Sequence, residues 1–383
     1  MINPHKVMEE AAQLALLGKG DNKTNPIVGA CVVKDSKIVS RGYHTGFGNP
    51  HAEVEAIDNS PVNVQGADLY VTLEPCSHFG KTPPCTKKII ESGIKRVFVG
   101  VVDPNPVNAG NGINELLKNG IEVYIGFAEK ICASLIEDFA KTIYKKEPYY
   151  TLKVAQSIDG KIALENGHSK WITNKSSRTY AHYLRSISDA VLVGTDTVLK
   201  DDPELNVRLI KSYREPFKVV LDTDLRINRE HKLVKNFAEY LVVFTSGENE
   251  GSDKWKMLKD SGVTLIPCKR GDFGLDLDFV SKELLKMNIM NVLVEGGSRI
   301  FGSFLKMKKV DKLNIFIAPK ILGDGVASFG GIKFNSIDEC IKFYDYEYKF
   351  IEKDLLISAS LTDYKKYVLE LTEKVRNRCL QGL

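Results

Sequence analysis

Hydrophobic and polar positions in the first fifty residues predict a helix followed by a β-hairpin. Apolar residues recur at helical spacing from Val7 to Ala15, and Gly18 follows as a typical C-terminal glycine. Two short β-rich runs come next, at 27–34 and 37–44, and only the polar pair "DS" separates them. The chain is therefore expected to begin with one helix and one hairpin.

After residue 50 the pattern alternates between helices and strands. Helices are predicted at 52–57, 85–93 and 112–120, and strands at 67–73, 94–101 and 121–126. This alternation is typical of an α/β sheet with helical crossovers. We expect a three-layer α/β/α domain.

A second alternating series begins after Pro148. A charged helix of about residues 128 to 145 ends just before this proline, which is a plausible hinge between domains 1–147 and 148–383. Further strands are predicted at 150–157, 190–194, 217–222, 240–246, 263–268, 291–297, 313–319 and 355–361. Several are continuous apolar runs, which are typical of sheets covered on both faces.

Length and composition narrow the class of protein. A chain of 383 residues exceeds the usual single-domain size, so two domains are expected. The net charge of +4 comes without a long Lys/Arg run, which argues against a nucleic-acid surface and is compatible with a small anionic substrate. Seven scattered cysteines favour reduced thiols, and with no signal peptide or spanning segment we expect a cytoplasmic protein without a membrane partner.

The segment "LYVTLEPCSHFGKTPPC" places Cys76 after a strand and Cys85 at the start of a helix. His51 precedes another helix, and Glu53 follows it by two positions. Each residue alone is more often a helix cap or a buried side chain. Together they match the zinc-deaminase pattern of H-x-E followed by P-C.

Three N/S ligands, His51, Cys76 and Cys85, leave one tetrahedral position of Zn²⁺ open, as in catalytic zinc sites. Zinc lowers the pKa of a bound water to about 7, and a neighbouring carboxylate such as Glu53 can move protons to the ring and the leaving ammonia. The nearby His44, His78 and Lys81 are equally compatible with substrate contacts and with solvated loop residues.

The segments "NPIVGACVV", "GYHTGFGNPHAEVEAI", "LYVTLEPCSHFGKTPPC" and "VGVVDPNPVNAGNGI" resemble the deaminase half of a bacterial bifunctional riboflavin-biosynthesis family. The long spacing in "PCSHFGKTPPC" matches this family rather than the C-x-x-C of tRNA or cytosine deaminases. The resemblance implies deamination of 2,5-diamino-6-ribosylamino-4(3H)-pyrimidinone 5′-phosphate. It also implies that His51, Cys76 and Cys85 bind zinc, and that Glu53 shuttles protons. Implied substrate contacts are Asn25, His44, His78, Lys81, Asp103 and Asn105.

In the second half, "NVLVEGGSRIFGSFL" is a strand, two glycines and a helix start, which by itself is only a weak anion-site signal. Its neighbours "TLKVAQSIDGKIA", "HSKWIT", "LRSISDAVLVGTDTVLKDDPELNVR" and "VLDTDLRI" resemble the reductase half of the same family, similar in fold to dihydrofolate reductase. The implied reaction is reduction by NADPH of the ribosyl group of 5-amino-6-(5-phosphoribosylamino)uracil.

Position by position, the resemblance implies two groups of contacts in this half. The NADPH contacts would be Ala155, Trp171, Thr197, Asp201, Thr223, Gly297, Ser298, Arg299, Ile300, Phe301, Gly302 and Ser303. The substrate contacts would be Ser169, Arg185, Leu205, Arg208 and Glu295, with Arg185 and Arg208 as phosphate partners. Lys153 and Asp159 are candidates for the polar floor of the site. Arg226 fits either the 2′-phosphate of NADPH or a surface charge.

The resemblance covers about residues 3 to 330, and departures within it are small. Ile158 replaces a usual leucine, and Arg299 lies where small or apolar residues are common. Self-association as a dimer or tetramer is expected from the family. One alternative is a nucleic-acid or free-base deaminase with an unrelated second domain. Another is a structural zinc whose fourth ligand is His44 or His78.

Overall fold

The computed structural model describes residues 2–21, 25–80, 82–212, 214–271 and 274–381. These residues form two compact units, of which the first contains Met1–Lys146 and Asp363–Leu383 and the second Glu147–Thr362. No helix among the described residues is long and apolar enough to cross a membrane.

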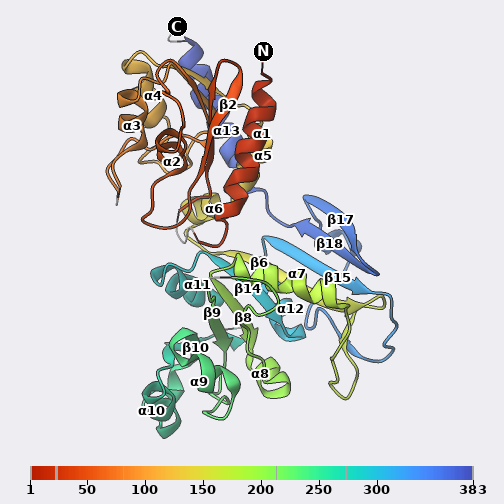
Figure 1. Ribbon diagram of the computed structural model, residues 1–383. Coiled ribbons are helices and arrows are strands. Elements are labelled where there is room, and N and C mark those ends of the chain that lie inside the picture. The colour runs from red at the N-terminus through yellow and green to blue at the C-terminus, as the bar shows by residue number, and fades with distance from the viewer. Residues whose placement is uncertain (1, 22–24, 81, 213, 272–273, 382–383) are drawn as a thin grey trace. The chain divides into compact units, whose positions relative to one another are not determined.

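The first unit is built on a five-stranded sheet of order β2-β1-β3-β4-β5. Its edge strand β2 is labelled in Figure 1. Its strands are β1 (Gly29–Lys34), β2 (Lys37–Tyr43), β3 (Asp68–Leu73), β4 (Arg96–Val101) and β5 (Glu122–Ile125). Its helices are α1 (Pro4–Ala15), α2 (Ala52–Asp58), α3 (Cys85–Glu91), α4 (Asn111–Lys118), α5 (Glu129–Leu135), α6 (Glu137–Lys145) and α13 (Tyr364–Gln381), with a 3₁₀ turn at Leu16–Gly18. The hairpin β1–β2 and the pair β1–β3 are antiparallel, and the other neighbours are parallel.

Side chains that alternate along the strands of this sheet enter two separate cores. On one face Cys31 and Tyr70 pack with apolar residues of α1, α5, α6 and α13. On the other face Val32 and Val71 pack with α2, α3 and α4. The unit therefore has the predicted three layers, α/β/α.

Close contact between α2 and β2 depends on Gly42. A Cβ atom at this position would lie 2.3 Å from the carbonyl oxygen of Ala52 and 2.4 Å from the amide nitrogen of Ala56. Only glycine therefore lets the backbone of α2 approach the hairpin this closely. The approach sets the position of His51, the residue immediately before the helix.

The second unit contains a nine-stranded sheet of order β11-β10-β9-β8-β14-β6-β15-β18-β17. Its strands are β6 (Tyr149–Ser157), β8 (Ala190–Gly194), β9 (Phe217–Leu221), β10 (Leu241–Ser246), β11 (Thr264–Cys268), β14 (Asn291–Gly296), β15 (Lys312–Ala318), β17 (Asp345–Ile351) and β18 (Asp354–Ser360). Strands β11 to β15 in this order are parallel, and β18 and β17 continue the sheet antiparallel. Short pairs are formed by β7 (Lys161–Ala163) with β16 (Val326–Ala327), and by β12 (Arg270–Gly271) with β13 (Gly274–Leu275).

Helices cover both faces of the parallel part of this sheet, as its apolar strands predict. Its helices are α7 (Lys175–Ser186), α8 (Thr195–Asp201), α9 (Lys232–Phe237), α10 (Asp253–Asp260), α11 (Leu277–Lys286) and α12 (Ser298–Lys306), with 3₁₀ turns at Ala238–Tyr240, Gly247–Asn249 and Ile337–Glu339. Val219 packs with residues of α11 and α12, whereas its neighbour Val220 packs with residues of α8, α9 and α10. Each core is thus supplied by alternate residues of the same strands.

Two features near the C-terminus differ from the sequence predictions. Strand β17 was not predicted, because its side chains alternate between charged and aromatic residues and nearly all are exposed. The expected second domain ran to residue 383, but α13 packs in the first unit, where Tyr364 and Val368 are buried in the core with α1 and α5. The chain thus returns to the first unit for its last helix.

Candidate active sites

His51, Cys76 and Cys85 meet at the carboxyl end of β3 in the first unit. The Nδ1 atom of His51 lies 3.2 Å from Sγ of Cys85 and 3.6 Å from Sγ of Cys76. All three ligand atoms lie within 4.8 Å of one another. Zinc bonds of about 2.0 to 2.3 Å to nitrogen and sulfur require separations of this size, so the three donors fit a zinc ion.

Local structure explains why these three side chains converge. His51 is the extended residue that precedes α2, and Cys85 is the first residue of α3 after Pro84. The amide of Cys85 donates a hydrogen bond to Sγ of Cys76 at 3.3 Å. Hydrogen bonding from the Cys85 thiol lowers the pKa of Cys76 to about 4, which favours the thiolate that binds metal. Among the described residues, this cluster of ligands has three members and includes neither His44 nor His78.

Glu53 is buried beside the cluster, with only 3% of its surface exposed. Burial raises the pKa of its carboxyl, although the charge of His51 opposes the rise. A carboxyl group in this setting can hold a proton nearer to neutral pH than an exposed glutamate can. It is therefore suited to proton transfer.

A cavity of about 280 Å³ opens over the cluster and is large enough for a small ring. Of the residues predicted to contact the substrate, Asn25, His44, His78, Asp103 and Asn105 line this cavity with His51, Glu53 and Cys76. Lys81, which was also predicted there, lies outside the described residues. The other five predicted substrate contacts thus line one cavity.

His44 is neutral, and both nitrogens of its ring form hydrogen bonds with neighbouring groups. Its Nδ1 lies 3.1 Å from the carbonyl of Pro50, which can only accept, so this nitrogen carries the proton. Its Nε2 then accepts a hydrogen bond from the Asn25 amide at 3.1 Å. Burial lowers the pKa of His44 in agreement with the neutral form. The ring is consequently a cavity wall rather than a fourth metal ligand.

Two buried residues that the sequence analysis overlooked hold the loop of Asp103. Glu74 accepts backbone hydrogen bonds from Asp103, Gly110, Gly112 and Ile113, and burial raises the pKa of its carboxyl to about 7. Asn108 donates to the carboxylate of Asp103 at 3.2 Å. Glu74 stands in the quoted motif "LEPC", but its contacts only become apparent once β3 and β4 lie side by side.

The second unit carries a larger cavity, of about 810 Å³, at the carboxyl ends of β8 and β9 and the start of α12. Predicted cofactor residues that line it are Thr197, Asp201, Thr223, Gly297, Ser298, Arg299, Ile300, Gly302 and Ser303. Its volume, its hydroxyl groups and the amide groups at the start of α12 fit a dinucleotide phosphate. Arg226 also lines this cavity and donates to Asp196 at 2.7 Å.

Other predicted cofactor contacts lie elsewhere. Ala155 and Trp171 are not among the residues that line the cavity, and Trp171 is 62% exposed. Phe301 is also absent from the cavity lining, because its ring is buried in the core between the sheet and α12. Ser169, predicted as a substrate contact, lines the same cavity and donates to Asp201 at 3.4 Å.

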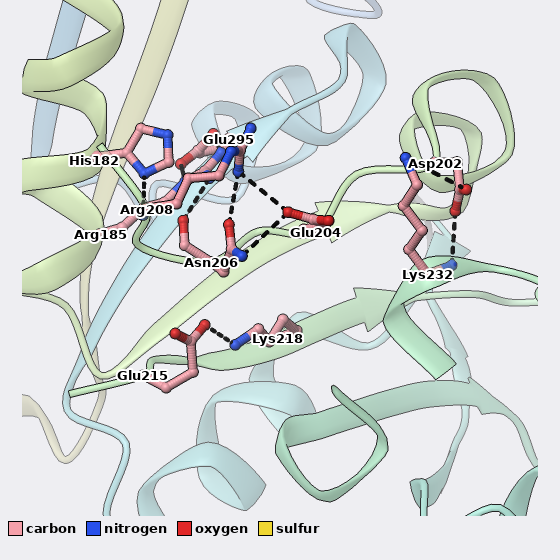
Figure 2. Close-up of polar contacts among 10 residues, drawn as sticks. All are labelled: His182, Arg185, Asp202, Glu204, Asn206, Arg208, Glu215, Lys218, Lys232 and Glu295. Atoms are coloured by element: carbon pink, nitrogen blue, oxygen red, sulfur yellow. Dashed lines mark hydrogen bonds and ion pairs between the residues drawn. The ribbon is translucent and has the colours of Figure 1, made fainter. Parts of the chain in front are cut away.

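The predicted substrate residues Arg185 and Glu295 form a buried ion pair between α7 and β14 (Figure 2). Nε and Nη2 of Arg185 donate to the two carboxylate oxygens of Glu295 at 2.6 and 2.8 Å, and Nη1 donates to the Asn206 carbonyl at 2.9 Å. Each nitrogen of Arg185 is therefore already engaged. Arg208, whose side chain is half exposed, is the better placed phosphate partner.

His182, which the sequence analysis did not single out, holds the backbone of the loop that carries Asn206 and Arg208 (Figure 2). Its Nδ1 accepts a hydrogen bond from the amide of Arg208 at 3.2 Å. Burial, together with the charges of Arg185 and Arg208, lowers the pKa of His182 to about 4, so the acceptor is present at neutral pH. Leu205 in this loop has a positive φ of 52° and a buried side chain.

The two candidates for the polar floor differ from each other. Lys153 lies near Glu295 and Arg185, and its burial lowers its pKa. Asp159 is exposed, and its carboxylate accepts hydrogen bonds from the amides of Leu322 and Gly323. Asp159 therefore caps the loop at Leu322, and its place on the floor of the site stays a prediction.

Comparison with known proteins connects both cavities to one family. A model of the cytidine and deoxycytidylate deaminase zinc-binding region matches residues 1–101, and a model of the RibD C-terminal domain matches residues 148–357. The RibD protein of Aquifex aeolicus is 45% identical over 350 residues, covering 91% of this chain and 96% of that protein. The RibD protein of Escherichia coli is 37% identical, covering 85% and 91%.

Solved structures agree over nearly the whole length. A Thermotoga maritima structure, described as a diaminohydroxyphosphoribosylaminopyrimidine deaminase/5-amino-6-(5-phosphoribosylamino)uracil reductase, is 39% identical with a TM-score of 0.83, covering 93% of this chain and 98% of that one. Acinetobacter baumannii RibD is 34% identical with a TM-score of 0.83, covering 94% and 99%.

Fold, ligand cluster and family matches together define a two-domain enzyme in which a zinc-binding deaminase domain precedes a reductase domain. The chain belongs to the RibD family of riboflavin biosynthesis proteins. The α/β class, the family and the pairing of zinc with NADPH chemistry are thus confirmed. A nucleic-acid or free-base deaminase with an unrelated second domain is not favoured, because the second half matches the RibD C-terminal domain.

Proposed function

We propose that this chain catalyses two consecutive reactions of riboflavin biosynthesis. The first is the zinc-dependent hydrolytic deamination of 2,5-diamino-6-ribosylamino-4(3H)-pyrimidinone 5′-phosphate. The second is the NADPH-dependent reduction of the ribosyl group of 5-amino-6-(5-phosphoribosylamino)uracil to ribityl. The observation that carries the proposal is the cluster of His51, Cys76 and Cys85 beside buried Glu53, at the edge of a cavity, in a chain whose second half contains a separate dinucleotide-sized cavity.

In the deaminase, His51, Cys76 and Cys85 hold the zinc ion, which when bound supplies an activated water at neutral pH. Glu53 takes up a proton on its carboxylate and delivers protons to the ring nitrogen and the departing ammonia. Its raised pKa supports this role, because the protonated and ionised forms then lie closer in energy at neutral pH.

The walls of the deaminase cavity select the substrate. Asp103 and Asn105 pair with amino and carbonyl groups of the pyrimidine, while His78 meets the phosphate. Asn25 and His44 form a hydrogen-bonded wall whose neutral imidazole does not compete for the zinc.

In the reductase, the lining of the larger cavity binds NADPH, which supplies the hydride. The amide groups at the start of α12 and the hydroxyls of Thr197 and Thr223 orient it. Arg208 binds the substrate phosphate. Arg185 and Glu295 position the loop that carries Arg208, and Lys153 adds a buried amine beside them.

Replacing Glu53 by Gln tests the deaminase. The variant should retain zinc but release ammonia at least about 100-fold more slowly, the usual contribution of an acid–base group. Glu55→Gln is a matched control on the same helix, because Glu55 only accepts a hydrogen bond from the side chain of Asn59. Mass spectrometry should show exchange of an amino group for oxygen, followed with NADPH by gain of two hydrogens. Full turnover by Glu53→Gln, or preferred deamination of tRNA or cytosine, would contradict the proposal.

Arg208→Gln tests the reductase, and we expect the KM for the deaminated substrate to rise while the Kd for NADPH stays unchanged. Arg226→Gln addresses the choice left open above. If the variant binds NADPH more weakly than the wild type but binds NADH equally well, Arg226 contacts the 2′-phosphate. If the variant binds both cofactors as the wild type does, Arg226 is a surface charge. NADPH oxidation that does not require the deaminated substrate would argue against the proposed second reaction.

We further propose a cytoplasmic homo-oligomer, a dimer or tetramer. Strand β17 forms an edge of the nine-stranded sheet and exposes Tyr346, Tyr348 and Phe350, and such an edge tends to pair with another copy. All seven cysteines are free, as expected in a reducing compartment. Light scattering should give at least twice the chain mass. Tyr348→Lys should lower the mass, whereas a monomeric wild type would refute the assembly.

A further inference from the structure

The C-terminal helix α13 holds the strand end that leads into the deaminase cavity. The hydroxyl of Thr372 accepts a hydrogen bond from the amide of Val102 at 3.0 Å and donates one to the carbonyl of Val368 at 2.8 Å. Thr372 and Val102 are fully buried. Val102 lies between the last residue of β4 and Asp103, which lines the cavity.

Beyond Val102, hydrogen bonds connect Asp103 with the segment that follows Cys76. The amide of Asp103 donates to Glu74, and the carboxylate of Asp103 accepts from Asn108. The side-chain oxygen of Asn108 accepts from the amide and the hydroxyl of Ser77, which directly follows Cys76. The Thr372 hydroxyl is therefore the outermost member of a network that includes Asp103 and ends at Ser77, the residue next to Cys76.

Other contacts fix α13 at the same place. Val375 packs with Val102 and Ile113, and Arg376 forms an ion pair with Glu129 at 3.0 Å. Removing the Thr372 hydroxyl would leave the Val102 amide without its partner, surrounded by apolar side chains. The loss of a partner for a buried donor is costly, so the strand end would be expected to shift toward another acceptor.

We propose that Thr372 is a positioning residue of the deaminase, which sets the place of Asp103 in the substrate cavity. The helix that carries it lies beyond residues 148–357, the range matched by the RibD C-terminal domain. The last helix of the chain thereby serves the reaction of the first domain. This inference rests on the deaminase reaction proposed above.

Three full-length variants test the inference. Thr372→Val keeps the shape and loses the hydroxyl, Thr372→Ser keeps the hydroxyl, and Glu373→Ala changes an exposed neighbour on the same helix. In Thr372→Val we expect the KM for the diaminopyrimidine phosphate to rise about tenfold, since a misplaced Asp103 weakens ring binding. Its kcat, zinc content and NADPH oxidation with the deaminated substrate should stay within about twofold of wild type. Thr372→Ser and Glu373→Ala should retain the wild-type KM.

Some outcomes would contradict the positioning role of Thr372, and one would contradict the proposed deaminase itself. An unchanged KM in Thr372→Val would overturn the positioning role. If kcat and the melting temperature fall while KM is unchanged, the defect is purely structural, because such a defect reduces only the fraction of active enzyme. If Thr372→Val does not fold, Thr372→Ala carries the same expectation for KM. An inactive wild type would overturn the proposed deaminase itself, and this inference with it.

Discussion

The buried ion pair of Arg185 and Glu295 makes a quantitative prediction for Glu295→Gln. The two side chains are 12% and 8% exposed and share two hydrogen bonds of 2.6 and 2.8 Å. The substitution preserves the shape of Glu295 but removes its charge. Arg185 then remains buried, with its main counter-ion gone.

The size of the effect follows from the pKa of Glu295. Burial alone would raise that pKa, but the charge and hydrogen bonds of Arg185 outweigh burial and lower the pKa from 4.5 to about 2. A fall of this size corresponds to about 3 kcal/mol of stabilisation of the ionised carboxylate in the folded state. Breaking a buried pair on one side usually costs about 3 to 5 kcal/mol. We therefore expect Glu295→Gln to lower the free energy of unfolding by about 3 kcal/mol.

Tryptophan fluorescence during urea unfolding measures this loss in the second unit alone. The only two tryptophans of the chain, Trp171 and Trp255, belong to that unit, and Trp255 is buried in its core. Glu204→Gln is the matched control, because Glu204 and Arg208 are partly exposed and 3.8 Å apart. An exposed pair of this kind contributes less than about 1 kcal/mol.

The pH dependence has a definite sign. Because the pKa of Glu295 is lower in the folded than in the unfolded state, its contribution is complete well above pH 4.5 and is lost as the pH falls toward 2. The difference between wild type and Glu295→Gln should thus be about 0.8 kcal/mol smaller at pH 4 than at pH 7. A difference below about 1 kcal/mol at pH 7, or one that grows on acidification, would refute the reasoning.

Two further predictions concern metal and loop geometry. Removing zinc with a chelator should abolish ammonia release and leave NADPH oxidation with the deaminated substrate intact, because the ligand cluster lies wholly in the first unit; parallel loss of both activities would contradict separate sites. His182→Asn, whose side-chain oxygen can replace Nδ1 as acceptor for the Arg208 amide, should keep the wild-type KM of the reductase, whereas His182→Leu should raise it about tenfold. If His182→Asn and His182→Leu have equal KM values at pH 7, His182 does not act as the acceptor that positions Arg208.

Much of the fold could be predicted because both sheets are covered by helices and their strands are apolar. Local signals also pointed to the cluster of candidate zinc ligands, since His51 and Cys85 lie at helix starts that the sequence marks with proline. Strand β17 was missed because an exposed edge strand needs no apolar face, and its pairing partner β18 supplies the register.

Long-range partners could not be predicted from local patterns. The resemblance implied a phosphate contact for Arg185, whereas nothing in the local pattern indicated that its guanidinium pairs with Glu295, 110 positions away. Asp159 was a candidate for the polar floor of the reductase site, and its hydrogen bonds come from the loop at Leu322, 163 positions away. A side chain's charge and neighbours along the chain indicate what it can bind, whereas its actual partner depends on which strands lie side by side.

The return of α13 to the first unit has a consequence for biosynthesis. Residues 147–362 are synthesised between the two segments that build the first unit, so the second unit emerges from the ribosome complete while the first still lacks its last helix. Domains generally fold as units during synthesis. The first unit, with the deaminase core, therefore finishes folding after the second unit.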